Sequence, residues 1–333
     1  MPFLGNKTTG VFEAVSPSRT SVNRSLASLG RAGRVDELPT LASSSDFSAQ
    51  TQGERRSCGN PDCTNAWTMP WRNRKRPIFE GNWGCSGRCV LAVVRAAVRR
   101  EQGERPVEVG TALHRHRVPL GLVMLAQGWI THPQLQQALQ RQRAEGEGRI
   151  GDWLVSECGL NAEQITRGLS VQWSCPVLST AGFRAETMAL VVPRILCEKF
   201  GVVPLRVSNG DRLYLGFEGR LDASAALGIE TMSELKTESG VMVEADFAGV
   251  KAELLEASPV KLHQESFSGT EVLAERVTAL LEQQQPAASR LVRVHHYYWL
   301  RIWLEKGAMG RAGTLPRSAE DVADYLFTAG KFA

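Results

Sequence analysis

Two stretches of this chain repeat each other at a fixed offset, and this repeat constrains the fold more than any other feature. Residues 119–142 read PLGLVMLAQGWITHPQLQQALQRQ, and residues 149–172 read RIGDWLVSECGLNAEQITRGLSVQ. Apolar residues recur in both copies at helical spacing, and Thr131 and Asn161 each begin a capping-box pattern. Each copy therefore predicts a short helix, a turn and a longer helix. The two helical hairpins can stack and bury one shared face.

Four of the seven cysteines form two close pairs, which are Cys58 with Cys63 and Cys85 with Cys89. We identify no signal peptide, and close pairs in a chain without an export signal are typical of metal ligands rather than disulfides. The second pair lies one helical turn apart where a helix is predicted to begin, with Ser86 as its N-cap. This order resembles a treble-clef zinc finger and predicts one structural Zn²⁺. The alternative is four free cysteines.

The composition indicates an ordinary globular chain. With 333 residues and 43% hydrophobic side chains, it is long enough for two or three domains with cores of their own. The net charge of +4 does not by itself indicate a nucleic acid or a membrane as partner. Because no run of about 18 apolar residues occurs, we expect a cytoplasmic protein without membrane insertion.

The predicted fold class is a multidomain α+β chain, whose parts follow from shifts in composition along the sequence. Ser, Thr, Gly and Arg dominate the first part, and the segment 258–269 is polar and predicts a linker. The run 291–304 is β-branched and aromatic and predicts one long strand with one buried face. The expected parts are a disordered tail (1–57), a zinc module (58–104), a helical repeat (113–180) with a small αβ subdomain (181–257), and a helix–strand–helix αβ segment (270–333).

The region 113–257 resembles the MshEN family, the N-terminal domain of type II secretion and type IV pilus assembly ATPases. The resemblance rests on the paired positions Leu120-Gly121 and Ile150-Gly151 and on downstream segments such as 200–205 and 212–217. It implies an accessory domain that docks protein partners of secretion or pilus machinery. Some members bind cyclic di-GMP through both motifs, which implies these candidate ligand contacts: Arg117, Leu120, Gly121, Gln142, Arg149, Ile150, Gly151 and Gln172.

The first motif departs from the family pattern. Pro119 stands where the family has arginine, whereas Arg149 begins the second motif as expected. Proline carries neither a charge nor an N–H donor, and Arg117 is the candidate substitute. We therefore expect cyclic di-GMP binding to be weak or absent. The alternative is a purely structural repeat that docks a protein partner.

Two function classes remain open, and neither is an enzyme. No G-x-x-x-x-G-K-[ST] phosphate loop occurs, and nothing supplies a nucleophile with a base. The first class is a regulatory or adaptor protein of bacterial secretion, pilus or signalling systems. The second is a nucleic-acid-binding regulator that uses the zinc module and its basic run Arg72–Arg76.

Overall fold

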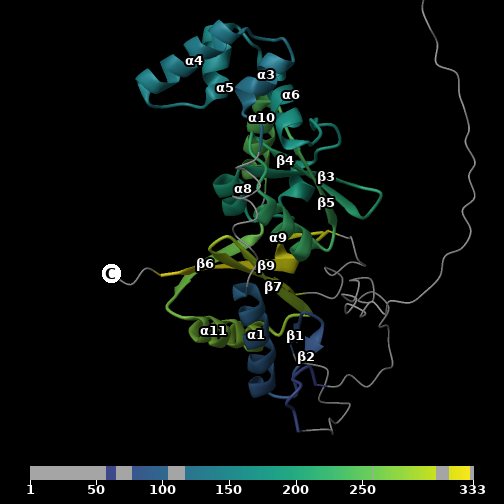
Figure 1. The fold of residues 1–333 in the computed structure, drawn as a ribbon. Helices are drawn as coiled ribbons and strands as arrows, with labels where there is room; N and C mark the ends of the chain where they lie inside the picture. The colour runs from purple at the N-terminus through teal and green to yellow at the C-terminus, as the bar shows by residue number, and fades with distance from the viewer. Residues whose placement is uncertain (1–57, 65–76, 104–116, 258, 305–314, 331–333) are drawn as a thin grey trace, which may run out of the picture. The chain divides into compact units, whose positions relative to one another are not determined.

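The protein is described by a computed structural model that covers residues 58–64, 77–103, 117–257, 259–304 and 315–330 (Figure 1). Helices and three small sheets together make it a mixed α+β chain, as its sequence predicts. The predicted tail 1–57 and the basic run Arg72–Arg76 lie outside the described residues.

The repeat forms four helices in the predicted order of short and long. Their bounds are α3 (Leu120–Ala126), α4 (His132–Glu145), α5 (Ile150–Cys158) and α6 (Ala162–Trp173). Both predicted capping boxes are present: the amide of Thr131 donates to Gln134, and the amide of Gln164 donates to Asn161. The helices bury one small apolar core of their own, formed by Leu120, Met124, Ile130, Leu135, Ala138, Leu154 and Leu160.

A small αβ subdomain follows the repeat. Its elements are α7 (Ala185–Met188), α8 (Arg194–Phe200), β3 (Val202–Ser208), β4 (Arg212–Phe217), α9 (Ala223–Ser233), β5 (Lys236–Val241) and α10 (Glu244–Glu256). The sheet order is β3-β4-β5, with β3 antiparallel to β4 and β4 parallel to β5. A parallel pair needs a crossover connection, and α9 provides it.

The C-terminal part is a four-stranded sheet with one long helix. Its elements are β6 (Lys261–Phe267), α11 (Thr270–Gln284), β7 (Ala288–Val294), β8 (Tyr297–Trp303), the 3₁₀ helix η3 (Ala319–Asp321) and β9 (Val322–Ala329). The strand order is β6-β9-β8-β7, so β6 and β7 are the edge strands.

Three expectations about this C-terminal part are wrong. The predicted linker 258–269 contains strand β6, which pairs in parallel with β9. The predicted long strand 291–304 is a hairpin of β7 and β8, which turns at His295 with a left-handed φ of 52°. The helix–strand–helix order is also wrong, because strands β7, β8 and β9 follow α11 in the described part of this segment.

Both faces of this sheet are buried, not one. Side chains alternate along the strands, so that Leu300 and its neighbours on one face pack with the helices α1 and α11, while Trp299 on the other face packs with the αβ subdomain. Helix α1 (Gly87–Gln102) follows the hairpin of β1 (Ile78–Phe79) and β2 (Asn82–Trp83) and lies beside α11 (Figure 1). The segment with the cysteine quartet therefore shares a core with the C-terminal sheet.

None of the described helices combines the length and the apolar character that a membrane-spanning segment needs.

Candidate functional site

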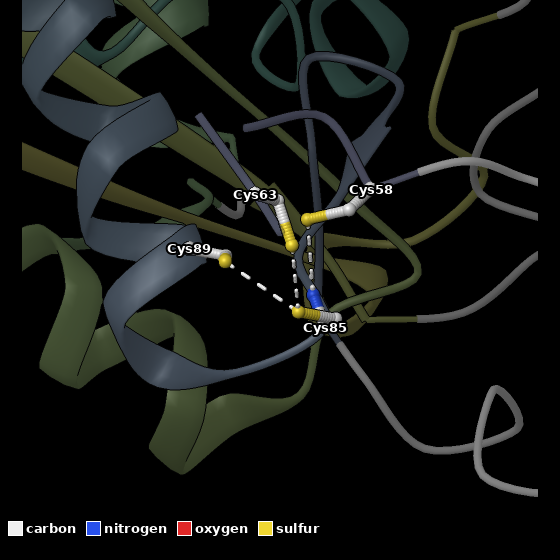
Figure 2. Close-up of side chains that lie close together, drawn as sticks. All are labelled: Cys58, Cys63, Cys85 and Cys89. Atoms are coloured by element: carbon white, nitrogen blue, oxygen red, sulfur yellow. Dashed lines mark hydrogen bonds between the residues drawn. The ribbon is translucent and has the colours of Figure 1, made fainter. Parts of the chain in front are cut away.

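The four paired cysteines converge at one point, as their spacing predicts (Figure 2). Their sulfur atoms all lie within 4.8 Å of one another. The Sγ atoms of Cys63 and Cys85 are 3.4 Å apart, and those of Cys85 and Cys89 are 3.5 Å apart. A tetrahedral metal with bonds of about 2.3 Å to sulfur places its ligands roughly 3.8 Å from each other. The quartet of Cys58, Cys63, Cys85 and Cys89 therefore has the donor chemistry and nearly the spacing of a closed metal shell.

Three local segments position this quartet. Cys58 and Cys63 precede strand β1, Cys85 lies between β2 and α1, and Cys89 lies in the first turn of α1. Ser86 is the N-cap of α1 as predicted, and its side chain accepts a hydrogen bond from the Cys89 amide. The amide of Cys85 donates to the sulfur of Cys58 at 3.4 Å. Such amide–sulfur bonds favour thiolates, which are the form that binds a metal.

The pKa values of Cys85 and Cys89 are shifted in opposite directions. Burial raises the pKa of Cys85 to about 12, and the neighbouring thiols act in the same direction. Burial also opposes ionisation of Cys89, but hydrogen bonds from Asn60, Ser86 and neighbouring cysteines outweigh it and lower the pKa of Cys89 to about 6. Of these two, Cys89 therefore provides a thiolate to an incoming cation more readily than Cys85 does.

The two motif glycines occupy equivalent places in the repeat. A Cβ atom on Gly121 would lie 2.5 Å from Leu135, and one on Gly151 would lie 3.3 Å from Ile165. In both copies the glycine therefore allows the first helix to approach the second. Leu120 is buried in the repeat core and Ile150 packs against it, so these candidate contact residues serve the packing of the repeat.

The two motif glutamines connect the copies in a reciprocal way. Gln142, near the end of α4, donates from Nε2 to the carbonyl of Gly148, just before the second motif, at 3.0 Å. Gln172, near the end of α6, donates from Nε2 to the carbonyl of Val118, just before the first motif, at 2.8 Å. Each copy of the repeat thus holds the backbone just before the first helix of the other copy. The family resemblance implies both glutamines as ligand contacts, and in the structure their Nε2 atoms donate to backbone carbonyls of the repeat.

The second-motif arginine is paired with a residue outside the repeat. Arg149 Nη1 lies 3.2 Å from a carboxylate oxygen of Glu218, which follows strand β4. The same nitrogen lies 3.7 Å from the position that a Cβ atom on Gly219 would take. An anion that binds Arg149 would therefore have to share it with Glu218.

Arg117 stacks on an aromatic ring. Its guanidinium carbon lies 3.5 Å from the ring centroid of Trp173, in a cation–π contact. The Nη1 atom is buried and has no hydrogen-bond partner among the described residues. Burial lowers the pKa of Arg117, and the positive charge of Arg220 acts in the same direction. A buried guanidinium nitrogen without an acceptor is costly, so this group is suited to an anionic or carbonyl ligand.

Three residues of this site were not predicted from the sequence. Trp173 follows the motif glutamine directly and could have been suspected from its position. Glu218 and Arg220 lie in the loop between β4 and α9, far along the chain from either motif. No local pattern links that loop to the repeat.

No protein-family model and no curated protein matches the chain. Among solved structures, it is similar to a structure of MshE with cdg at 23% identity and a TM-score of 0.36, over 41% of this chain and 99% of that one. Two structures of the N-terminal domain of XpsE are similar at 14% identity. Their TM-scores are 0.30 and 0.25, over 40% and 45% of this chain and 92% and 97% of theirs. At TM-scores this low the likeness establishes no function.

Proposed function

We propose that this chain is a non-enzymatic regulatory or adaptor protein of the bacterial cytoplasm, with a structural zinc ion and a helical repeat that docks protein partners. In this proposal it is related to the N-terminal domains of secretion and pilus ATPases. The candidate small ligand of the repeat is a cyclic dinucleotide such as cyclic di-GMP, bound weakly.

Zinc is the proposed metal because of the donor set. Four cysteine sulfurs provide a soft, tetrahedral shell, which suits zinc and leaves no open position for substrate. The order of ligand pair, hairpin and ligand-bearing helix supports a treble-clef-like module. This argues for a structural ion rather than a catalytic one.

The asymmetry between Arg117 and the second-motif Arg149 supports the ligand proposal more than any other observation. Arg117 has a buried nitrogen that meets no acceptor in the described part of the chain, whereas Arg149 is already paired with Glu218. A cyclic dinucleotide carries two phosphates and two bases, so it can place an anionic oxygen near each arginine and a base against an aromatic ring. The ion pair to Glu218 and the proline at the first motif both weaken such binding.

Calorimetry of the full chain with cyclic di-GMP tests this proposal. The unmodified protein is expected to bind weakly, with a Kd well above the micromolar range. Replacing Arg149 or Arg117 with Ala removes one charge-assisted contact, worth about 1.5–3 kcal/mol, and weakens binding roughly ten- to a hundredfold. Tight binding that neither substitution changes would refute the proposed site.

A Glu218→Gln variant provides a matched gain-of-binding test. It keeps the size of the side chain and removes the charge that competes for Arg149. Since an exposed ion pair is worth up to about 1 kcal/mol, affinity should rise by up to about fivefold. Arg212, paired with Glu238 on the neighbouring strands, gives the control: Glu238→Gln should leave ligand binding unchanged.

The nucleic-acid alternative depends on Arg72–Arg76, which lie outside the described residues, and it stays a prediction.

A further inference from the structure

Strand β7 is an edge strand whose outer backbone groups are hydrogen-bonded to the cysteine module, by which we mean the described residues of 58–103. The carbonyl of Ser289 accepts from the amide of Glu80 at 2.8 Å. The amide of Leu291 donates to a carboxylate oxygen of Glu80 at 3.3 Å, and the amide of Arg293 donates to Glu101 at 2.8 Å. The backbone groups of these alternate residues point away from β8. The module therefore covers an edge whose N–H and C=O groups would otherwise be unpaired.

Two carboxylates, those of Glu80 and Glu101, anchor the cysteine module to this edge, and they lie in different kinds of structure. Glu80 lies in the turn between β1 and β2, with a left-handed φ of 47°. Glu101 lies in the last turn of α1, and its side chain is 2% exposed. Arg100 lies between them and contacts both carboxylates, at 2.7 Å to Glu80 and 3.1 Å to Glu101.

The Glu101 anchor is held by helix packing. Val94 and Val98 of α1 are buried against α11, where they meet the apolar face that contains Val277. Burial of this kind contributes about 25 cal/mol for each Å² and does not require a metal.

The Glu80 anchor lies in a much smaller element, and Arg100 of α1 is its side-chain partner there. Strands β1 and β2 have two residues each, and a hairpin this short is not stable alone in water. The cysteine quartet connects this hairpin to the segment before it and to the start of α1. Phe79 and Trp83 add two buried rings, and Arg100 of α1 binds both carboxylate oxygens of Glu80. Metal bound at the quartet would add the crosslink that joins the hairpin to the segment before it.

From this difference we propose that metal bound at Cys58, Cys63, Cys85 and Cys89 controls the outer edge of β7. Release of the metal loosens the β1–β2 hairpin, detaches Glu80 and exposes Ser289 and Leu291, while Glu101 stays bonded to Arg293. The inference rests on the proposed metal site. A bare edge strand is a template for pairing with another extended chain, so metal loading also protects this edge.

Residue-resolved amide hydrogen exchange tests the proposal on the full chain, under reducing conditions, before and after chelation of zinc. The Leu291 amide should exchange about tenfold faster or more without metal, since loss of its bond raises the population of open states. The Arg293 amide should change by less than about threefold. Zinc added back should restore protection at Leu291.

Two variants make the test specific. Glu80→Ala in the zinc-loaded chain should speed exchange at Leu291 as chelation does, and chelation should then add little. Cys158→Ser removes a cysteine of α5 that is not in the quartet, and it should behave as the unmodified chain.

The outcomes distinguish metal control of the β7 edge from metal binding itself. If the purified chain carries no metal, the proposed zinc site is wrong and metal control of this edge is wrong with it. If zinc is bound and its removal leaves Leu291 protected, only the proposed control of the edge is wrong. If Leu291, Arg293 and the amides of β4 all lose protection together, the metal holds the whole fold and does not control this edge.

Discussion

Arg301 and Asp324 form a doubly hydrogen-bonded ion pair inside the C-terminal sheet. Two guanidinium nitrogens of Arg301 donate to the two carboxylate oxygens, at 2.8 Å and 2.7 Å. Trp299 donates a third bond to the same carboxylate, and Arg301 also donates to the backbone carbonyls of Leu190 and Val191. The pair therefore connects strands β8 and β9 with the segment before α8.

Breaking this pair should destabilise the protein strongly. Asp324→Asn keeps the shape of the side chain but leaves the buried guanidinium of Arg301 without a countercharge. The free energy of unfolding should fall by about 3–5 kcal/mol, measured by urea unfolding. Glu238→Gln, which breaks the exposed pair with Arg212, should change it by less than about 1 kcal/mol. Equal effects of the two variants would contradict this account.

The purified chain should contain one zinc ion per molecule. Metal analysis of Cys63→Ser should show most of that zinc lost, because three sulfurs no longer close the shell. Cys197 is fully buried and its pKa is raised to about 12, so it cannot replace the missing ligand. Cys158→Ser should keep the full metal content. A full zinc content in Cys63→Ser would show that the ion binds elsewhere.

Asp222 should make stability depend on pH at the acidic end. Its carboxylate begins α9, where it accepts from the Ala225 amide at 2.9 Å, and it lies 2.7 Å from Nε2 of His295. Burial acts to raise the pKa of Asp222, but the hydrogen bonds from His295 and Ala225 and the positive charges nearby outweigh it and lower this pKa. A depressed pKa in the folded state contributes stability above the ordinary aspartate pKa. That contribution is lost as the pH falls through the folded pKa.

The variant Asp222→Asn isolates this charge, because asparagine is also a good N-cap. At about pH 7 it should be less stable than the unmodified chain by about 1 kcal/mol in urea unfolding. The difference should begin to shrink as the pH falls below the ordinary aspartate pKa of about 4, where the unfolded chain becomes protonated, and it should vanish below the lowered pKa of the folded chain. A difference that stays constant across this range would argue against the carboxylate as its source.

The repeat and the cysteine quartet were predictable because their signals are local. Helical spacing, the capping residues Thr131 and Asn161, and the two cysteine pairs are all visible within short windows. Strand β6 was missed because an edge strand with Lys261 and Glu265 on it shows little hydrophobic alternation. The β7–β8 turn was missed because His295 adopts a left-handed φ without the glycine or asparagine that normally signals such a turn.

The rest of the candidate site depends on contacts between distant parts of the chain. Glu218 meets Arg149 across 69 residues, and Glu101 meets Arg293 across 192 residues. Nothing near either residue in the sequence indicates its partner. Such contacts follow only from how the elements pack, which a single sequence does not reveal.

Two glycines in helices should respond in opposite directions to the same substitution. A Cβ atom on Gly228 of α9 would lie 2.4 Å from Cγ2 of Val294, a buried and stiff side chain of β7, whereas one on Gly249 of α10 would meet nothing within 4 Å. Alanine is favoured over glycine in a helix by about 0.8–1.0 kcal/mol. Gly249→Ala should therefore stabilise the protein by up to about 1 kcal/mol, measured by urea unfolding.

In Gly228→Ala the same helical gain is opposed by overpacking against β7, which typically costs about 1–3 kcal/mol. The net effect should be destabilising. A Gly228→Ala/Val294→Ala double variant tests the cause, because removing the valine methyl groups opens the space that the new Cβ atom needs. In that background the alanine at position 228 should no longer destabilise. If it still does, α9 is limited by something other than its approach to β7.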